Sequence, residues 1–335
     1  GTMNLPRQTT LLPYLNSGFR PYIKAAAAAD DPAQYTASSM STDQRKVSAT
    51  GFSVYAQVAD DADEDSVIAV LPTVQQELTQ ALIDGEEDAI LNGSTAASHP
   101  DALAAWNIRG RWGASGLGGS ADHRRAWLGL RHAARAITGG STTMGGALSV
   151  DNILENRARL DSPHGVEGSL IMIVSPEVYF KSLLQADEVM TVEKIGQDRA
   201  SIRTGGLGEI FGMPIIVSEF MAADMTTAGL YDDGSTDFSG AIIVNKDRWM
   251  IGQRRGSTLE VDKDITRGVH RMVATVRETF FTLDPSTKKT CITLSTSPAK
   301  RQRTEIPQWQ NLNPVLSRSI LERSTLRPHL APSTA

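Results

Sequence analysis

The spacing of hydrophobic and polar positions changes near residue 60 of the chain. Residues 46–58 nearly alternate between apolar and polar side chains, with a slip at Gly51, and are rich in β-branched and aromatic residues. This period of two predicts a strand with one buried face and a bulge at the slip. From residue 67 to 89 the apolar side chains mostly recur every three or four positions, after the acidic run 60–66. That period predicts an amphipathic helix whose positive N-terminal end the acids complement.

This helix, predicted over residues 66–92, is the longest element that the pattern indicates. Proline is tolerated in the first turn of a helix, so the regular part begins either at Ser66 or at Pro72. Gly93 follows as a stop signal. About twenty residues, from Pro72 to Leu91, would span roughly 30 Å. A helix of that length can serve as a structural axis.

Two glycine-rich loops enclose a second predicted helix. Residues 93–120 combine Gly, Ser and Trp without a clear period, and residues 139–146 are again rich in glycine. Residues 121–138 between them show a helical pattern with several Arg and His side chains. We expect this helix to be basic on its exposed side.

The remaining pattern mixes short helices with strands. A third helix is predicted at 149–160, with Ser149 or Asp151 as its N-cap. The apolar run 169–175 predicts a strand buried on both faces, and Pro176 then opens a short helix. Further strands are predicted at 213–218, 241–245, 249–252, 258–262, 269–283 and 290–296. Helices mixed with antiparallel strands in this order indicate an α+β fold.

The two ends of the chain differ in charge from its body. Residues 1–29 carry +3 and residues 300–335 carry +4, which leaves −12 on the body of a chain whose net charge is −5. Prolines and an alanine run make the first 45 residues typical of an extended arm followed by a projecting loop. We expect the basic arms to contact neighbouring copies of the same protein. Plain unstructured tails and contact with a polyanion are the alternatives.

Several chemistries are excluded by composition. Cys291 is the only cysteine, which rules out an intramolecular disulfide and a thiolate metal cluster, and a small buried side chain is expected there. The aspartates in 61–65 resemble the start of a calcium loop, but Ser66 and Pro72 stand where that loop needs Gly and Glu. No apolar run is long enough to span a membrane, and no secretory signal pattern opens the chain.

Glycine-rich motifs give no phosphate or nucleophile site. The glycines in 205–212 lead into the strand around Pro214 rather than into a helix, so a turn is expected instead of a dinucleotide loop. Residues 113–116 approach a nucleophile elbow, but Leu117 replaces its second glycine. The Walker A pattern is absent from the sequence.

Histidine and tryptophan spacings assign no ligand. The histidines lack a metal-binding spacing, and solvated or hydrogen-bonded roles are expected for all of them: His99, His123, His132, His164, His270 and His329. Burial in a core or a subunit interface is expected for the tryptophans: Trp106, Trp112, Trp127, Trp249 and Trp309. The sequence therefore assigns no catalytic, cofactor-binding or metal residue, and the chain is not expected to be an enzyme.

Five segments in order resemble the major capsid proteins of tailed bacteriophages that share the Hong Kong 97-type shell fold. They are the strand 46–58, the helix ending G-E-E-D-A-I-L-N-G at 85–93, the segments 149–154 and 170–184, the strand 210–218, and residues 241–255 followed by 258–264. The resemblance covers residues 40–298. The stretch before the long helix is short for the family, and residues 299–335 extend beyond its usual end.

The resemblance implies a division of the chain and a function. The implied parts are an N-terminal arm 1–17, an extended loop 18–60, a peripheral domain 61–146 with a spine helix 66–92, an axial domain 147–255, closing strands of the peripheral domain 256–298, and a C-terminal extension 299–335. The implied function is self-assembly, as pentamers and hexamers, into the icosahedral or prolate shell around a double-stranded DNA genome. The implied partners are further copies, a portal protein, scaffolding or decoration proteins, and packaged DNA bound without sequence specificity, with no cofactor and no membrane. The implied location is the virion, and the host cytoplasm during assembly.

Two other functions stay open. One is an encapsulin-like nanocompartment of the same fold, although residues 1–24, with three prolines, make a poor cargo-binding helix. The other is a soluble enzyme or binding domain without a recognisable motif. The start Gly1-Thr2-Met3 fits either a remnant of expression before a native Met3 or maturation cleavage, and cleavage is favoured.

Some members of this family join a loop lysine to an asparagine of a neighbouring subunit. Lys24 and Lys46 are candidate donors in this chain. Alignment with the family places Gly268 at the acceptor position, and the sequence has no asparagine from 246 to 310. Because glycine has no side-chain amide, we expect a shell held together without covalent cross-links.

Overall fold

The computed structural model describes the following residues: 1–22, 36–61, 70–96, 99–101, 121–161, 165, 168–185, 208–221, 225–231 and 238–296. The chain separates into a unit of residues Gly1–Pro298 and a second unit, Ala299–Ala335. The second unit, with the basic tail predicted to contact neighbours, lies outside the described residues. None of the described helices is long and apolar enough to cross a membrane.

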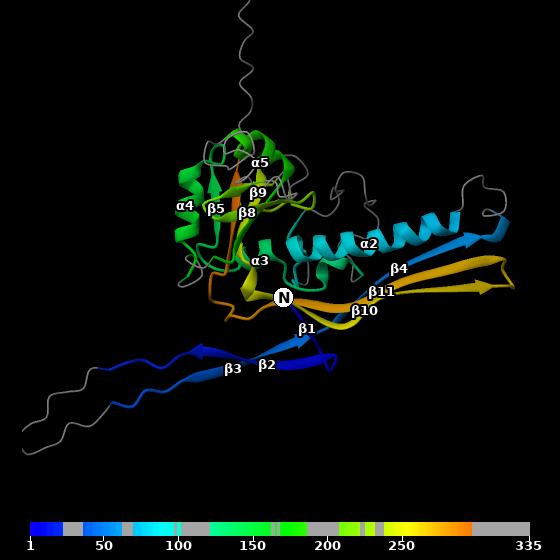
Figure 1. Cartoon of the computed structure of the whole chain (residues 1–335), viewed down its shortest axis with the longest axis horizontal. Helices are drawn as coiled ribbons and strands as arrows, with labels where there is room; N and C mark the ends of the chain where they lie inside the picture. Colours follow the sequence, from blue (N-terminus) through cyan, green and yellow to red (C-terminus); the bar gives the residue numbers. More distant parts are fainter. Residues whose placement is uncertain are drawn as a thin grey trace, which may run out of the picture. The chain divides into compact units, whose positions relative to one another are not determined.

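The first sheet has four strands in the order β1-β10-β11-β4 (Figure 1). Its strands are β1 (Thr2–Asn4), β4 (Thr50–Ala59), β10 (Trp249–Asp264) and β11 (Val269–Thr282). β4 and β11 pair in antiparallel fashion from Thr50 opposite Glu278 to Ala59 opposite Val269. The two strands predicted at 249–252 and 258–262 form one strand, β10, whose pairing with β11 shifts register twice between Gln253 and Thr258.

The predicted bulge at Gly51 is wrong. β4 pairs with β11 through Gly51 without a shift. The break lies at Ala49, between β3 (Ser41–Ser48) and β4, where the chain leaves a two-stranded ribbon and enters the four-stranded sheet. The hydrophobic pattern slips because the strand changes partner, and a change of partner resembles a bulge in sequence. The single buried face is confirmed, since Phe52 and Val58 are buried while Ser53 and Gln57 are exposed.

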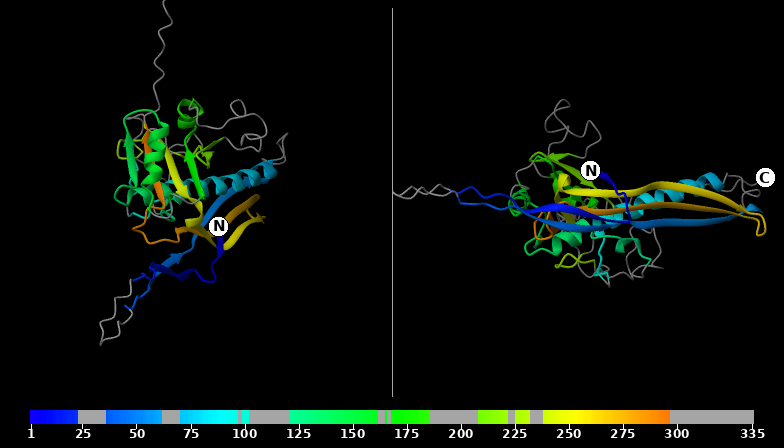
Figure 2. Two further views of the ribbon diagram at one scale, coloured as in Figure 1. Left: turned by 60° about the vertical axis from the view of Figure 1, so that its left-hand side comes forward. Right: turned by 90° about the horizontal axis from the view of Figure 1, so that it is seen from below.

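Helix α2 (Val70–Asn92) packs along this sheet against β4 and β11, as Figure 2 shows from two further sides. Its buried Leu78, Leu82 and Ala89 join Phe52 of β4 and Met272 of β11 in one hydrophobic core. Burying each leucine stabilises the fold by about 2 kcal/mol. The long helix and its end at Asn92 are confirmed; its predicted start at 66 falls outside the described residues.

The second sheet has six strands in the order β5-β12-β9-β6-β8-β7. Its strands are β5 (Ser141–Met144), β6 (Leu170–Val174), β7 (Glu209–Ile210), β8 (Met213–Val217), β9 (Ser239–Asn245) and β12 (Cys291–Thr296). β9 and β12 are buried at every residue, including the polar Ser239 and Asn245 of β9 and Thr293, Ser295 and Thr296 of β12. The helices beside it are α4 (Val150–Ala158) and α5 (Pro176–Lys181), and Ser149 and Ser175 cap them by accepting hydrogen bonds from backbone N–H groups.

Two sequence-based placements are corrected by this sheet. β12 was expected among the closing strands 256–298 of the peripheral domain, but it pairs with β9 and β5 instead. The glycine-rich loop 139–146 contains the strand β5, whose partner is likewise β12. Both strands find their partners across long sequence separations, which no local pattern encodes.

A separate ribbon is formed by β2 (Thr9–Ser17) and β3, which pair in antiparallel fashion (Figure 1). Arg45 of β3 donates hydrogen bonds to the carbonyls of Thr282 and Asp284, and so ties the base of the ribbon to the end of β11. Between β7 and β8 a two-residue turn holds Phe211 and Gly212 at positive φ, which confirms the expected turn there. Short 3₁₀ turns also occur at η3 (His123–Arg125), η4 (Leu183–Gln185) and η6 (Lys246–Arg248).

Candidate functional site

The end of helix α2 is held by a close backbone approach. The helix predicted at 121–138 is instead the turn η3 followed by the short helix α3 (Leu130–Arg135). Gly129 interrupts them, because its N–H donates to the Gly93 carbonyl at 2.8 Å. A Cβ on Gly93 would lie 2.3 Å from the Ala89 carbonyl oxygen and 2.6 Å from that of Trp127. Only glycine fits there, which gives the Asn-Gly ending of the long helix a physical reason.

A buried polar network surrounds this helix end, and the basic exposed side expected for 121–138 is therefore wrong. Arg131 is 1% exposed and forms a two-pronged ion pair with Asp101 through Nη1 and Nη2. Its Nε donates to Asn92 Oδ1 at 3.0 Å, and its Nη1 also donates to the Gly229 carbonyl at 2.7 Å. Arg124 is fully buried and pairs with Asp122 at 2.9 Å.

Asn92 is the centre of the network. Its side-chain amide donates to Asp88 Oδ1 at 2.8 Å and to the Phe220 carbonyl at 2.7 Å, while its own carbonyl contacts His99 Nε2 at 3.1 Å. One turn earlier in α2, Asp88 contacts His123 Nε2 at 2.8 Å. These bonds join α2 to segments that precede β5 and to residues that follow β8.

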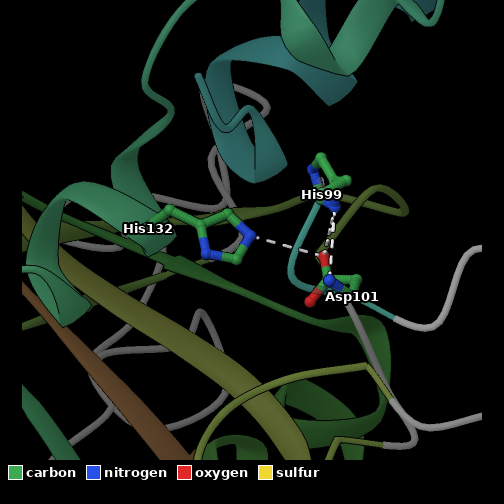
Figure 3. A group of neighbouring side chains, drawn as sticks. All are labelled: His99, Asp101 and His132. Carbon is green, nitrogen blue, oxygen red and sulfur yellow. Dashed lines mark hydrogen bonds and ion pairs between the residues drawn. The ribbon is translucent and has the colours of Figure 1, made fainter. Parts of the chain in front are cut away.

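Two histidines complete the network around Asp101. Figure 3 shows His99 and His132 approaching this carboxylate from different segments. His132 Nε2 lies 3.4 Å from Asp101 Oδ2, and its Nδ1 lies 3.2 Å from Arg135 Nη1. His99 Nδ1 accepts from the Asp101 N–H at 3.3 Å. The backbone N–H of Tyr231 also donates to Asp101, at 3.1 Å. All ring nitrogens therefore have partners.

Burial and the arginine set the charges of these groups. Burial and the neighbouring Arg131 guanidinium together lower the pKa of His132 to about 4. Burial also lowers the pKa of His99. Burial opposes ionisation of Asp101, but Arg131 and His132 outweigh it and hold the pKa of that carboxyl well below its usual range. At neutral pH the centre is one buried ion pair flanked by two neutral imidazoles.

The same three residues are close enough to be tested as a metal site, and they do not fit one. The ligand atoms of His99, Asp101 and His132 lie within 4.8 Å of one another. A bound cation would have to displace the Arg131 guanidinium from Asp101 and the hydrogen bonds to both imidazoles. Two positive groups would then share one carboxylate in a buried site. The geometry therefore favours a fixed hydrogen-bonded joint.

A pair of carboxyl groups lies beside the joint, where α2 packs on the first sheet. Glu278 of β11 is 2% exposed and contacts Glu86 of α2. Burial and the charge of Glu86 raise the pKa of Glu278 to about 7, and its protonated form donates a hydrogen bond to Glu86. Two carboxylates so close cannot both ionise without cost.

Most other residues singled out in the sequence have ordinary surroundings. All four described histidines, His99, His123, His132 and His270, make hydrogen bonds or ion pairs, as expected. Trp127 and Trp249 are buried, and Cys291 is buried and reduced. Lys46 is exposed on β3, and Gly268, at φ +60°, turns the chain between β10 and β11. Outside the described residues lie Lys24, Asp63, Asp65, Trp106, Trp112, His164, Gly205, Gly206, Trp309 and His329.

The network was missed by sequence reasoning. The pairs Asp88–Asn92 and His99–Asp101 are spaced for local contact, but such spacings are common on solvated surfaces. Arg131 meets Asp101 only because Gly129 brings α3 against the end of α2.

Comparisons by sequence and by structure all match this chain to capsid proteins. The model of the phage capsid family matches residues 16–277. The major capsid protein of Escherichia phage T5 is 24% identical over 207 residues, which are 62% of this chain and 37% of that protein. A chain from Microbacterium phage Oxtober96 superposes with a TM-score of 0.58 at 11% identity, covering 88% of each chain. A chain from the capsid of a native GTA particle gives 0.53 at 11% identity, covering 88% of this chain and 87% of the other.

Proposed function

Because this chain belongs to the phage capsid family and has its Hong Kong 97-type fold, we propose that it is a major capsid protein of a tailed bacteriophage. In this role, copies of the chain assemble into the closed shell that surrounds the double-stranded DNA genome. The observation that carries the proposal is the family match over most of the chain. The chain spans only 37% of the curated relative, so that protein's whole architecture is not transferred.

The ribbon of β2 and β3 supports an assembling subunit. Leu11 is 59% exposed and Leu15 is 53% exposed on β2, and Phe19, just beyond it, is 71% exposed. Exposed apolar side chains gathered on a two-stranded ribbon are costly in water for an isolated subunit. Contact with a neighbouring copy would cover them, as an extended loop of a shell subunit does.

We propose a domain division that follows the strand pairing within each sheet. The extended loop comprises the ribbon, residues 9–48. The peripheral domain comprises α2 with the first sheet, and the axial domain comprises the second sheet, including β5 and β12. In this proposal the buried network of Arg131 and Asn92 fixes the peripheral domain to the axial domain.

The remaining roles follow from a shell. The subunit carries no catalytic function, its main partners are copies of itself in pentamers and hexamers, and portal, scaffolding or decoration proteins bind the shell. DNA lies against the inner surface without sequence-specific contacts. The protein is a component of the virion, and it assembles in the host cytoplasm.

Electron microscopy of the purified, concentrated protein tests the proposal. Closed shells built from pentamers and hexamers are expected. A population of monomers under every assembly condition would overturn the shell function. Particles purified from infected cells should contain DNA; shells filled with an enzyme would instead indicate a nanocompartment.

A further inference from the structure

A groove of about 340 Å³ opens where the ribbon, the first sheet and helix α3 meet. Its floor is aromatic, with the rings of Trp249 and Phe280 stacked at 4.9 Å between centroids. One wall is formed by the segment that contains α3, where Leu128 is 38% exposed and Ala136 is also exposed. Small-molecule sites in proteins have volumes of about 300–1,000 Å³. The groove can therefore hold a ligand of roughly ten non-hydrogen atoms, at the ~30 Å³ that one water molecule occupies in the liquid.

The rim of the groove is cationic. Arg45 and Lys46 of β3 and Lys288 of the connection between β11 and β12 line it, and none of the lining residues is acidic. The Arg45 guanidinium is held by two backbone carbonyls near the end of β11, one of them from Asp284, whose carboxylate lies 3.9 Å from Arg248 Nε. The ammonium groups of Lys46 and Lys288, by contrast, are exposed and form no ion pair with any described residue.

An apolar floor below an uncompensated cationic rim favours one class of ligand. An amphiphilic monoanion gains twice, because its apolar chain removes the aromatic floor from water while its charge is attracted to the rim. An inorganic anion would leave the floor in water, and a cationic amphiphile would be repelled by the rim. The basic tail 300–335 carries +4, the same sign as the rim. The indole N–H of Trp249 is buried without an acceptor among the described residues, so the floor has no polar demand that a described side chain satisfies.

We propose that the groove binds a free medium-chain carboxylate of about ten carbons, with its chain on the Trp249–Phe280 floor and its carboxylate facing Lys46 and Lys288. A membrane phospholipid has two longer chains, which a groove of this volume cannot enclose, so the source is the free acid. The site belongs to the subunit itself and does not rest on the proposed shell function. Because one lysine comes from β3 and the other from the β11–β12 connection, the bound carboxylate bridges them and restrains the base of the ribbon.

Calorimetric titration of the unassembled, full-length subunit with decanoate tests the site. A single saturable site is expected, with a Kd of about 10–100 µM for a ligand of this size. Decanamide has the same chain without the charge and should bind about tenfold more weakly, because it loses only the attraction to the rim. Decyltrimethylammonium should not bind. Equal affinities for the three ligands would overturn the proposal, since the contact would then be apolar only.

Two sets of substitutions locate the ligand. Lys46→Gln with Lys288→Gln should lower the affinity for decanoate about tenfold, to that of decanamide, and leave the affinity for decanamide unchanged. Lys246→Gln with Arg254→Gln removes two exposed charges outside the groove and is the matched control, which should change neither affinity. Ala136→Trp fills the groove from an exposed position that lines it, and should abolish the binding of both ligands. Decanoate affinity that none of these substitutions changes would place the ligand elsewhere and overturn the proposal.

Hydrogen exchange is an independent readout of the same site. Saturating decanoate should slow the exchange of backbone amides in residues 45–47, at the base of the ribbon, at least threefold, and should leave β7 unchanged. Unchanged exchange in residues 45–47 would refute the bridge between the two lysines. A decanoate affinity that falls as the subunit concentration rises would show that a second copy occupies the groove, and would overturn the small-molecule site.

Discussion

Removal of the Arg131 guanidinium should destabilise the subunit more than any surface change. In Arg131→Met the ion pair with Asp101 is lost, together with the hydrogen bonds to Asn92 Oδ1 and to the Gly229 carbonyl. Among the described residues, the Asp101 carboxylate then stays buried beside two neutral imidazoles, His132 and His99, and accepts the Tyr231 N–H. Removing one partner of a buried pair costs about 3–5 kcal/mol. This is a large part of the 5–15 kcal/mol that typically stabilises a domain.

Urea denaturation at low protein concentration, followed by tryptophan fluorescence, measures this change on unassembled subunits. Arg254→Met, an exposed substitution on β10, is the control and should stay within about 0.5 kcal/mol of wild type. Adding Asp101→Asn to Arg131→Met should recover about 1–2 kcal/mol, because no unpaired charge then remains buried.

The pH dependence gives this prediction a second readout. Without the arginine, burial raises the pKa of Asp101 instead of leaving it depressed, so the folded variant takes up a proton more readily than the unfolded chain. The deficit relative to wild type should therefore shrink as the pH falls from 7.5 to 5. A deficit below 1 kcal/mol that is independent of pH would refute the buried joint.

Four further outcomes are expected. The pKa of Glu278 is raised from 4.5 to about 7, so the stability that the protonated side chain contributes is complete below pH 4.5 and falls as the pH rises to 7. Urea denaturation should therefore show Glu278→Gln to be more stable than wild type by about 1–3 kcal/mol at pH 8 and equally stable at pH 4.5. Gly93→Ala should lower the melting temperature by several degrees because its Cβ meets backbone atoms, whereas Gly145→Ala, with open space around it, should not. Mature particles should give a single band near 36.1 kDa on denaturing gels, since Gly268 offers no amide for a cross-link; a ladder would contradict this. Deletion of 300–335 should weaken shells towards heat and salt without unfolding the subunit, and unchanged shell stability would count against a structural tail.

The local pattern was sufficient for most elements of the chain. Apolar spacing located α2 and its end at Asn92, and the apolar runs located β6, β8 and β9. Such elements can be predicted from a few turns or one strand length, because the spacing at which apolar residues recur depends only on residues close together in the sequence. The resemblance to capsid proteins depends on the same local segments, which explains why it could be found without a structure.

The partners of these elements were decided by the tertiary structure alone. Cys291–Thr296 reads equally well as a strand of either sheet, and only its pairing with β9 assigns it. The arginines of 121–138 resemble a solvated basic face, yet Arg124 is buried against Asp122 at the start of η3, and Arg131 is buried against Asp101 on α3, the helix that Gly129 brings to the end of α2. An ion pair between residues thirty positions apart leaves no period in the sequence. A buried charge is tolerated only where the fold places an opposite charge next to it. That placement depends on how elements far apart in the sequence pack together.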